Sequence, residues 1–403
     1  MSPEPGGPMS IANPWPFLAI NLLCFVLAWS AARVSPFYQQ IAREPGAGRT
    51  EMIDGLRGWL ALGVFFTHAV AMYSYQRDGQ WSSAGAPFYA LTGHVGVSVF
   101  FVITGFLFWT KVLKSNGTLN AVALYRSRIR RLVPMYLVSV IFVLAVVAAL
   151  SGFTLRSDPV TLLRELRSWL SFGFLYAGDI NGVKDAHRIN AVYWTLAYEW
   201  VFYIALPFLA LFSRFPLCLA LFGAAFFFGA QAPITLNFIS GAVAAMVVHR
   251  GVLPAGLDSR WLTPLPVAAL VAVFLLPSSA ALAQVVLLFV FFLFVAHGNS
   301  FFGLLASGAA KVLGAASYSI YLLHCIVLFI VMQAVDARIP IAGIAAETYW
   351  GFAALAATAT VLLSLATYRY VEYPFLAGKR RAKPLEPLAS IAPGSLAKSV
   401  TVE

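Results

Sequence analysis

Long apolar runs, separated by short stretches rich in charge, proline or glycine, dominate the chain. A helix needs roughly 20 apolar residues to cross a hydrocarbon core of about 30 Å. The sequence therefore predicts an all-α fold, a polytopic transmembrane helix bundle of about ten core helices, at 53–74, 93–113, 131–151, 191–212, 215–230, 234–249, 262–277, 280–297, 313–334 and 348–370. The two helices predicted within 215–249, and the two within 262–297, can also be divided at other positions.

An eleventh apolar run, 11–32, precedes these ten. No basic residue comes before Arg33, so the basic segment that opens a signal peptide is missing. We therefore predict an extra N-terminal transmembrane helix. The predicted organisation is this helix with a cytoplasmic linker (1–50), a transmembrane domain (51–376) and a basic, disordered cytoplasmic tail (377–403).

The composition excludes most soluble classes of protein. Hydrophobic residues make up 60% of the chain and charged residues 11%, against roughly 45–50% and 25% in soluble domains. Such a chain cannot supply the charged surface of a soluble enzyme or of a nucleic-acid-binding domain, so no nucleic acid partner is expected. Cys24, Cys218 and Cys325 lie inside apolar runs, with neither disulfide nor metal-site spacing. We predict no metal.

The formal net charge of +11 reflects membrane topology for the most part. With the segment before residue 53 inside and the spans alternating, 20 of the 27 Lys and Arg residues fall on the inner side. Cytoplasmic loops of membrane proteins carry such an excess. The asymmetry predicts a cytoplasmic C-terminus and, if 11–32 spans the membrane, an outer N-terminus.

His68 is a candidate general base. Ionisable residues inside spanning helices are costly and are functional candidates by default. His68 lies 14 residues beyond Asp54, roughly 21 Å along a helix that begins at the inner side with Asp54 and Arg57. A neutral imidazole in an apolar groove can remove the proton of a hydroxyl group. The alternative is a histidine that packs between helices and bonds to a neighbour.

A basic cluster precedes Pro134 and the following apolar run. Arg128 and Arg131 share one helix face at i, i+3, and Pro134 suits the first turn of a helix. Guanidinium forks bind phosphates in bidentate fashion, and a helix N-terminus also favours anions. Positive-inside topology or lipid headgroup binding explains the cluster equally well at this stage. Its members are Arg126, Arg128, Arg130 and Arg131.

Three further polar residues stand within apolar runs. Glu199, in the run WTLAYEWVFY, enters the membrane from the outer side, so its carboxylate could orient the imidazole of His68. The surrounding aromatic residues alone are typical of an interfacial belt. His94 and His324 are as consistent with packing as with catalysis. Small residues near His94 permit either close helix approach or a loop that lines a cavity; they are Gly93, Gly96, Ser98 and Gly105.

Six short motifs follow one another along the chain. They are IDGLRG (53–58) followed by His68, FFVITGFL (100–107), RIRRLVP (128–134), WTLAYEWVFY (194–203), SYSIYLLH (317–324) and VEYPF (371–375). In this order they resemble the motifs of acyltransferase family 3, the integral-membrane O-acyltransferases. The resemblance extends over about residues 50–376. Two positions depart from the common pattern, Thr104 where serine is usual and Tyr373 where arginine is common. Each motif alone is weak, but six in register are specific.

The resemblance implies an enzyme of a bacterial plasma (inner) membrane that transfers an acyl group, usually acetyl from acetyl-CoA or another acyl-CoA, to a hydroxyl. The acceptor in the family is often an envelope or exported glycan. By the same resemblance His68 is the catalytic base, and Arg128 and Arg131 hold the acyl-CoA phosphates. The supporting site residues are Glu199, Asp54, Arg57 and, more weakly, His324.

Two other functions stay open at this stage. A transporter or flippase of a glycan or lipid precursor would also need a watered cavity with scattered polar groups, although it does not explain the combination of His68 with Arg128 and Arg131. A membrane acyltransferase of another class would use one buried histidine, but it would not share the order of the motifs. Acceptor, acyl chain length and oligomeric state are not predicted.

Overall fold

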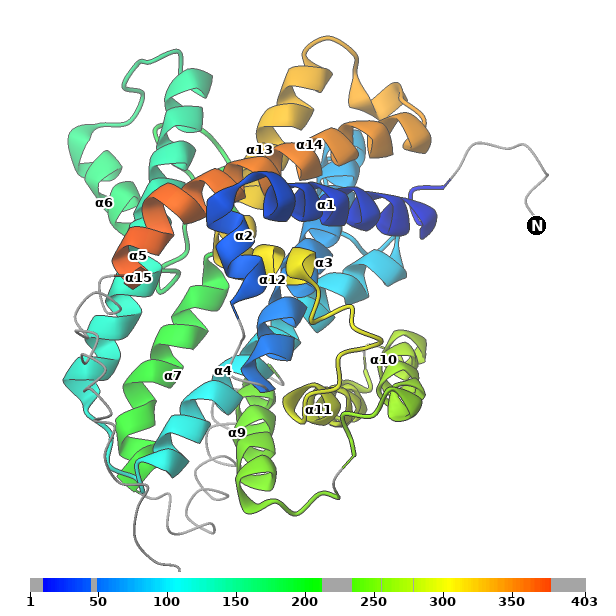
Figure 1. Cartoon of the computed structure of the whole chain (residues 1–403). Helices are drawn as coiled ribbons and strands as arrows, with labels where there is room; N and C mark the ends of the chain where they lie inside the picture. Colours follow the sequence, from blue (N-terminus) through cyan, green and yellow to red (C-terminus); the bar gives the residue numbers. More distant parts are fainter. Residues whose placement is uncertain (1–9, 45–48, 212–233, 255, 278, 378–403) are drawn as a thin grey trace, which may run out of the picture.

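The chain is described by a computed structural model covering residues 10–44, 49–211, 234–254, 256–277 and 279–377 (Figure 1). These residues form helices and their connections, without a β-strand among them. The all-α prediction is confirmed. In chain order the main helices are α1 (Trp15–Val34), α2 (Pro36–Arg43), α3 (Arg49–Asp78), α4 (Pro87–Lys114), α5 (Ala121–Leu150), α6 (Pro159–Trp169), α7 (Trp194–Leu211), α9 (Thr235–Arg250), α10 (Pro264–Leu275), α11 (Ala281–Ala296), α12 (Gly308–Ala315), α13 (Ser317–Asp336), α14 (Ala346–Thr367) and α15 (Tyr373–Ala377).

Seven helices of the described ranges are long and apolar enough to cross a membrane. They are α1, α3, α4, α5, α7, α13 and the continuous segment from α14 to α15. The predicted extra helix 11–32 is therefore a helix of spanning length, α1. The predicted spans 234–249, 262–277 and 280–297 correspond to α9, α10 and α11, with 16, 12 and 16 residues. The predicted span 215–230 lies outside the described residues.

Helices α3 and α13 form the centre of the bundle. In the spanning windows of α3 and α13, 78% and 67% of the residues are buried. Helix α3 contacts α4, α12, α13 and α11, while α13 contacts α14 and α5 (Figure 1). The four candidate residues Asp54, Arg57, His68 and His324 therefore lie on two of the three most enclosed long helices, the third being α4.

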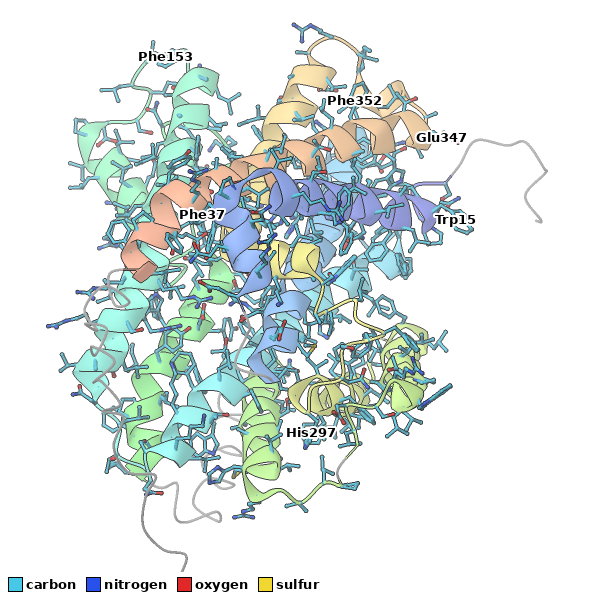
Figure 2. The ribbon with its side chains drawn as sticks, in the orientation of Figure 1. Trp15, Phe37, Phe153, His297, Glu347 and Phe352 are labelled. Atoms are coloured by element: carbon cyan, nitrogen blue, oxygen red, sulfur yellow. The ribbon has the colours of Figure 1, made fainter. Side chains whose placement is uncertain are left out.

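The outer surface of the bundle is apolar. Trp15 on α1 and Phe153 after α5 are 67% and 83% exposed and project away from the bundle (Figure 2). Leu22 on α1 and Leu275 on α10 are 64% and 79% exposed. Lipid tails tolerate such side chains, whereas water does not. This surface agrees with a multi-pass membrane protein.

The start of α5 corrects one prediction from the sequence. The helix begins at Ala121, where the Asn120 side chain accepts a hydrogen bond from the backbone N–H of Ala123 at 2.9 Å. Pro134 lies inside the helix and not in its first turn. The apolar run starts only after the arginines, but the N-cap of Asn120 extends the helix beyond the apolar segment. Arg128 is thus a mid-helix side chain.

Glycines allow α4 and α9 to pack with their backbones in contact. A Cβ atom on Gly105 would lie 2.1 Å from the carbonyl oxygen of Phe238, and one on Gly241 would lie 2.1 Å from that of Val102. A Cβ on Gly93 would lie 2.2 Å from Thr67 Oγ1 of α3. The expected close approach at the small residues of α4 is confirmed.

Replacing Gly105 with alanine is expected to lower the thermal unfolding midpoint of the detergent-purified protein by several degrees, because α4 and α9 must separate to accept the methyl group. Gly351→Ala on α14 is the matched control, since nothing lies within 4 Å of its added Cβ. Helix propensity alone favours alanine there by up to about 1 kcal/mol. Equal midpoints for the two variants would contradict the packing argument.

Candidate active site

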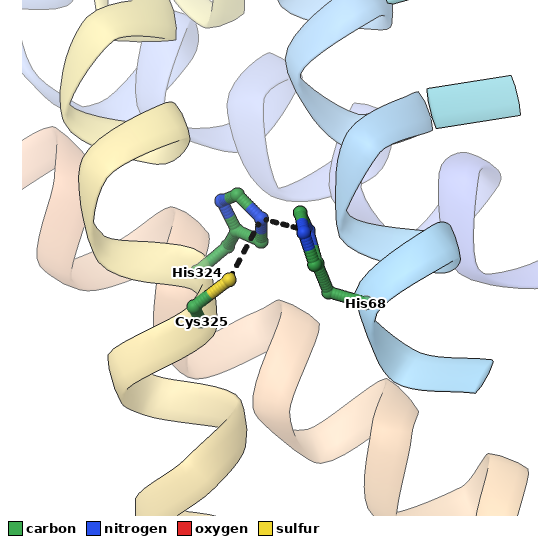
Figure 3. A group of neighbouring side chains, drawn as sticks. All are labelled: His68, His324 and Cys325. Carbon is green, nitrogen blue, oxygen red and sulfur yellow. Dashed lines mark hydrogen bonds between the residues drawn. The ribbon is translucent and has the colours of Figure 1, made fainter. Parts of the chain in front are cut away.

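His68 of α3 and His324 of α13 form a hydrogen-bonded pair at the centre of the bundle (Figure 3). The distance between His68 Nδ1 and His324 Nε2 is 2.9 Å, and the ring centroids are 5.1 Å apart. His324 is fully buried, whereas His68 is partly exposed. The pair thus presents one accessible imidazole supported by one enclosed imidazole.

Backbone carbonyls determine the tautomers of the neutral pair. His324 Nδ1 lies 3.1 Å from the carbonyl oxygen of Ile320, which only accepts, so this nitrogen carries the proton. His324 Nε2 then holds a lone pair and accepts from His68 Nδ1–H, which also lies 3.1 Å from the carbonyl oxygen of Val64. We therefore assign the remaining lone pair to His68 Nε2. This is the nitrogen that a general base requires.

His324 occupies the position beside His68 that the sequence suggested for Glu199. The carboxylate of Glu199 instead accepts a hydrogen bond from the hydroxyl of Tyr203, four residues further along α7. His68 and His324 are 256 residues apart in the sequence. No spacing rule connects such positions, and only the packing of α3 against α13 brings them together.

Cys325 completes a group of three metal-type donors with the histidine pair. Its Sγ lies 3.4 Å from His324 Nε2, and the three donor atoms lie within 4.8 Å of one another (Figure 3). Imidazole and thiolate are ligands of Zn²⁺, and the sequence did not predict this grouping. Hydrogen bonds among the neutral side chains account for these contacts without an ion.

A second feature is a cavity with an empty volume of about 800 Å³, which we name the arginine cavity. Three arginines and one glutamate, contributed by α3, α5 and α7, give it a positive balance. Aromatic and aliphatic side chains form the rest of its wall. Its lining includes Arg57, Arg128, Arg131, Glu199, Thr195, Tyr203, Ser317, Tyr318 and Tyr321.

Two donors at this cavity have no partner within the described part of the chain. They are Arg128 Nε and Ser317 Oγ, both buried. The Arg128 guanidinium lies over the Phe108 ring at 4.9 Å, which fixes its plane. A buried charged donor left unpaired is costly, so an anionic ligand would relieve that cost.

The basic cluster of α5 divides into two sets. Arg128 and Arg131 line the cavity, whereas Arg126 and Arg130 are exposed. Arg128 and Arg131 are therefore on one helix face, as their i, i+3 spacing in the sequence predicted.

Acidic residues surround the arginines. Asp54 Oδ1 lies 3.8 Å from Arg57 Nη1, and the Asp54 side chain is 57% exposed. The carboxylate of Glu372 accepts a hydrogen bond from Ser319 and is within electrostatic range of Arg131 and Arg57. Glu372 is 4% exposed and ends a π-helical turn, Tyr368–Glu372. Sequence reasoning assigned it no role, although a lone acid in the run VEYPF was a usable signal.

A third feature is a second cavity beyond the histidine pair, which we name the loop cavity. It has an empty volume of about 470 Å³ and lies between the far ends of α3 and α13 and the loop before α7. Its polar and aromatic lining includes Tyr75, Lys184, Asp185, Arg188 and Gln333. Tyr75 follows His68 by seven residues on the same helix face, roughly 10 Å along the axis.

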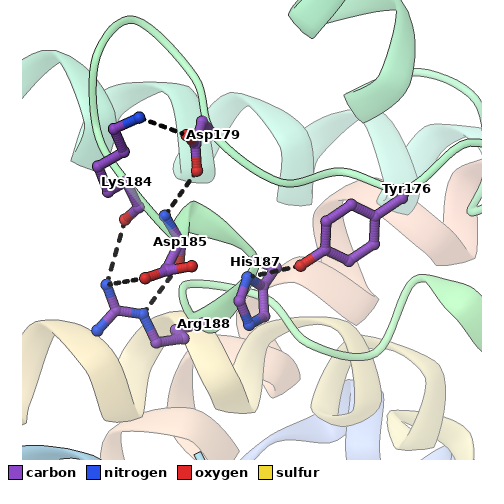
Figure 4. A network of polar contacts seen from close by, with 6 residues as sticks. All are labelled: Tyr176, Asp179, Lys184, Asp185, His187 and Arg188. Atoms are coloured by element: carbon purple, nitrogen blue, oxygen red, sulfur yellow. Dashed lines mark hydrogen bonds and ion pairs between the residues drawn. The ribbon is translucent and has the colours of Figure 1, made fainter. Parts of the chain in front are cut away.

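A polar network holds the loop cavity in shape (Figure 4). Arg188 Nε donates to the Asp185 carbonyl oxygen at 2.9 Å, and its guanidinium lies 3.7 Å from the centroid of the Tyr75 ring. Asp179 accepts from the Asp185 N–H at 2.8 Å and pairs with Lys184 at 3.2 Å. The Asp185 N–H lowers the pKa of Asp179, with a smaller effect from Lys184. The charged loop is thus ordered.

Comparisons with known proteins agree with the motifs. The family model of the acyltransferase domain of acyltransferase family 3 matches residues 51–369. "Nodulation protein 10" of Rhizobium leguminosarum bv. viciae is 25% identical over 175 residues, which cover 42% of this chain and 46% of that protein. A Staphylococcus aureus (strain MSSA476) protein named "Putative O-acetyltransferase" is 26% identical over 178 residues, which cover 42% of this chain and 25% of that protein.

These alignments span less than half the length of either curated relative. No solved structure matches the chain. The family model, by contrast, covers α3 to α14 and therefore contains the histidine pair and the arginine cavity. The chain belongs to acyltransferase family 3.

Proposed function

We propose that this protein is a membrane-embedded O-acyltransferase that moves an acyl group, most simply acetyl, from acyl-CoA to a hydroxyl of a carbohydrate or glycan-type acceptor. The observation that carries the proposal is the histidine pair, in which the Nε2 atom of His68 keeps its lone pair. His68 lies on α3, and this helix connects two different cavities. Arg57 of that helix lines the arginine cavity, and Tyr75 lines the loop cavity.

The arginine cavity fits the phosphates of an acyl-CoA. Arg128 and Arg131 present guanidinium groups from one helix face, and Arg128 Nε is buried without a partner among the described residues. Guanidinium groups bind phosphate in bidentate fashion. Arg57, which pairs with Asp54, adds positive charge. The carboxylate of Glu199 accepts a hydrogen bond from the Tyr203 hydroxyl, and the Arg128 guanidinium lies 5.7 Å from the centroid of the Tyr203 ring. The thioester of the bound donor supplies the activated acyl group.

The loop cavity supports approach of the acceptor from the opposite side. Tyr75 and the side chains of Arg188 and Gln333 offer an aromatic surface beside planar hydrogen-bonding groups. Such a combination suits a hydroxyl-rich ring with apolar C–H edges. The Trp81 ring stacks over His68 with 6.2 Å between centroids, so an aromatic surface also lies beside the base itself.

His68 acts as general base in the proposed reaction. Its Nε2 accepts the proton of the acceptor hydroxyl, and the resulting oxygen nucleophile attacks the thioester carbonyl carbon. His324 holds the ring through His68 Nδ1 and spreads the positive charge that the imidazolium acquires. The imidazolium then returns the proton to the departing thiolate. The products are an O-acyl ester and free CoA.

The proposal is tested with membranes of the source organism from which the gene has been deleted. Deletion membranes complemented with the wild-type chain are expected to incorporate label from [¹⁴C]acetyl-CoA into an alkali-labile ester on a glycan fraction, whereas deletion membranes are not. Loss of a glycan or lipid precursor from the far leaflet with no labelled ester in either membrane would instead favour a transporter or flippase.

His324→Leu is expected to lower kcat by about 10²-fold with an unchanged KM for acetyl-CoA, because His68 loses the partner that holds its ring and spreads the charge of the imidazolium. His324→Gln keeps an acceptor oxygen on a side chain of similar length and is expected to recover part of that loss. Initial rates of label incorporation at varied acetyl-CoA measure both constants. If the His324→Leu and His324→Gln variants fold in equal yield and react at equal rates, His324 contributes to packing alone.

A further inference from the structure

Tyr321 lies between the arginine cavity and the histidine pair. It is on α13, one turn before His324, and the two ring centroids are 6.0 Å apart. Its other face is near Phe100 of α4, again with 6.0 Å between centroids. Tyr321 lines the arginine cavity, although neither His68 nor His324 does. A group passing from the cavity to the histidine pair therefore meets Tyr321.

The hydroxyl of Tyr321 carries a proton that can be redirected. Its oxygen lies 2.8 Å from Thr195 Oγ1, and Thr195 donates to the Val192 carbonyl oxygen at 2.9 Å. Tyr321 therefore donates to the Thr195 hydroxyl, which is a neutral and weak acceptor. A charged acceptor in the cavity would compete well, because hydrogen bonds to an ionised group are roughly twice as strong as neutral ones.

Three other hydroxyls of the cavity are placed differently. Tyr318 donates to the Leu132 carbonyl oxygen at 3.0 Å, and Tyr203 donates to the Glu199 carboxylate. Both acceptors are stronger than a hydroxyl oxygen. Ser317 has a free Oγ but precedes His324 by seven residues, roughly 10 Å along α13. Only Tyr321, among these four hydroxyls, combines a weak acceptor with contact to the histidine pair.

We propose that Tyr321 is a further catalytic residue, whose O–H donates a hydrogen bond to the oxyanion formed from the thioester carbonyl. This inference rests on the proposed acyl transfer. When the acceptor oxygen bonds to the carbonyl carbon, the π electron pair moves to the carbonyl oxygen. The Tyr321 proton then turns from Thr195 to that oxygen, while the acceptor proton is on His68. Collapse re-forms the carbonyl, breaks the C–S bond and passes the proton from His68 to the thiolate.

The position of Tyr321 suits this role energetically. Tyr321 is 9% exposed, so its hydroxyl acts in a largely water-excluded site where a preorganised donor stabilises developing charge most effectively. Thr195 can donate to the Tyr321 oxygen once the Tyr321 proton has turned, which would strengthen the donor further. The same pair of hydroxyls makes a weaker contact with the neutral ground-state carbonyl, so its effect falls on kcat.

The test uses Tyr321→Phe in the complemented membranes described above. The variant is expected to lower kcat about 10²-fold while the KM for acetyl-CoA and the affinity of the purified protein for free CoA stay within threefold of wild type. Thr195→Val is expected to give a smaller loss of kcat in the same direction. Tyr349→Phe is the matched control, because its buried hydroxyl donates to the Ala69 carbonyl oxygen at 2.6 Å without lining either cavity.

Four outcomes separate the alternatives. A kcat for Tyr321→Phe within threefold of wild type overturns the inference and leaves the acyl transfer intact. A raised KM with unchanged kcat also overturns it, since Tyr321 then only shapes the cavity. Absence of labelled ester with the wild-type chain contradicts the acyl transfer itself. A fall in kcat for Tyr349→Phe equal to that of Tyr321→Phe would show that loss of any buried tyrosine hydroxyl suffices, which overturns the inference as well.

Discussion

His68→Ala is expected to reduce acyl transfer about 10³-fold or more at saturating acetyl-CoA and acceptor. Positioned general bases contribute about 10²–10⁴-fold, and His68 is both the accessible member of the pair and the one with an unused lone pair. The affinity for free CoA is expected to stay near that of wild type, because His68 does not line the arginine cavity. Label incorporation and CoA binding by calorimetry measure the two effects separately.

His94→Ala is the control for loss of a membrane histidine. His94 is an exposed residue of α4 and lines neither cavity, so this variant is expected to keep wild-type turnover. Normal turnover by folded His68→Ala protein would remove the general-base role. A fall of equal size for both histidine variants would point to damage to the bundle in place of lost chemistry.

The double variant Arg128→Ala/Arg131→Ala is expected to weaken acetyl-CoA binding by about 10²-fold or more. Hydrogen bonds to charged groups contribute about 1.5–3 kcal/mol each, and 1.4 kcal/mol corresponds to a tenfold change in affinity. Arg128→Lys/Arg131→Lys is expected to recover only part of the loss, because an ammonium keeps the charge without the bidentate fork. Titration calorimetry with CoA measures the dissociation constants directly.

Arg126→Ala/Arg130→Ala provides a control of identical net charge. Both residues lie on the exposed part of the same helix and line neither the arginine cavity nor the loop cavity, so CoA affinity is expected to change less than threefold. The comparison separates a local phosphate site from a general effect of positive charge at this membrane surface. If both pairs weaken binding equally, the cluster serves topology or lipid headgroups and the donor site must lie elsewhere.

The order of helices was largely predictable because long apolar runs have few alternatives in a membrane. Helices α3, α4, α7 and α13 fall where the runs predicted, and small residues of α4 mark close helix contacts. The prediction failed at the start of α5, since hydropathy detects the hydrocarbon segment and not the capped helix that extends beyond it. The short helices α9, α10 and α11 begin and end close to the bounds of their predicted runs.

For the site, the sequence provided residue types and the structure provided partners. The i, i+3 spacing of Arg128 and Arg131 places them on one face, and both line the arginine cavity. The aromatic run around Glu199 gave no indication that its carboxylate contacts Tyr203 and that His324 supports His68. Spacing within one helix is a local property, whereas contact between helices depends on how they pack.

The sequence by itself determined an all-α membrane protein, its family and the polar residues that interrupt its apolar helices. These are local consequences of hydropathy and of residue order. Only the tertiary structure decided that His68 pairs with His324, that Glu372 comes within electrostatic range of Arg131 and Arg57, and that Tyr321 lines the arginine cavity. The histidine pair and the interaction of Glu372 with the arginines join residues far apart in the chain, and only the packing of α3, α13 and their neighbours brings such residues together.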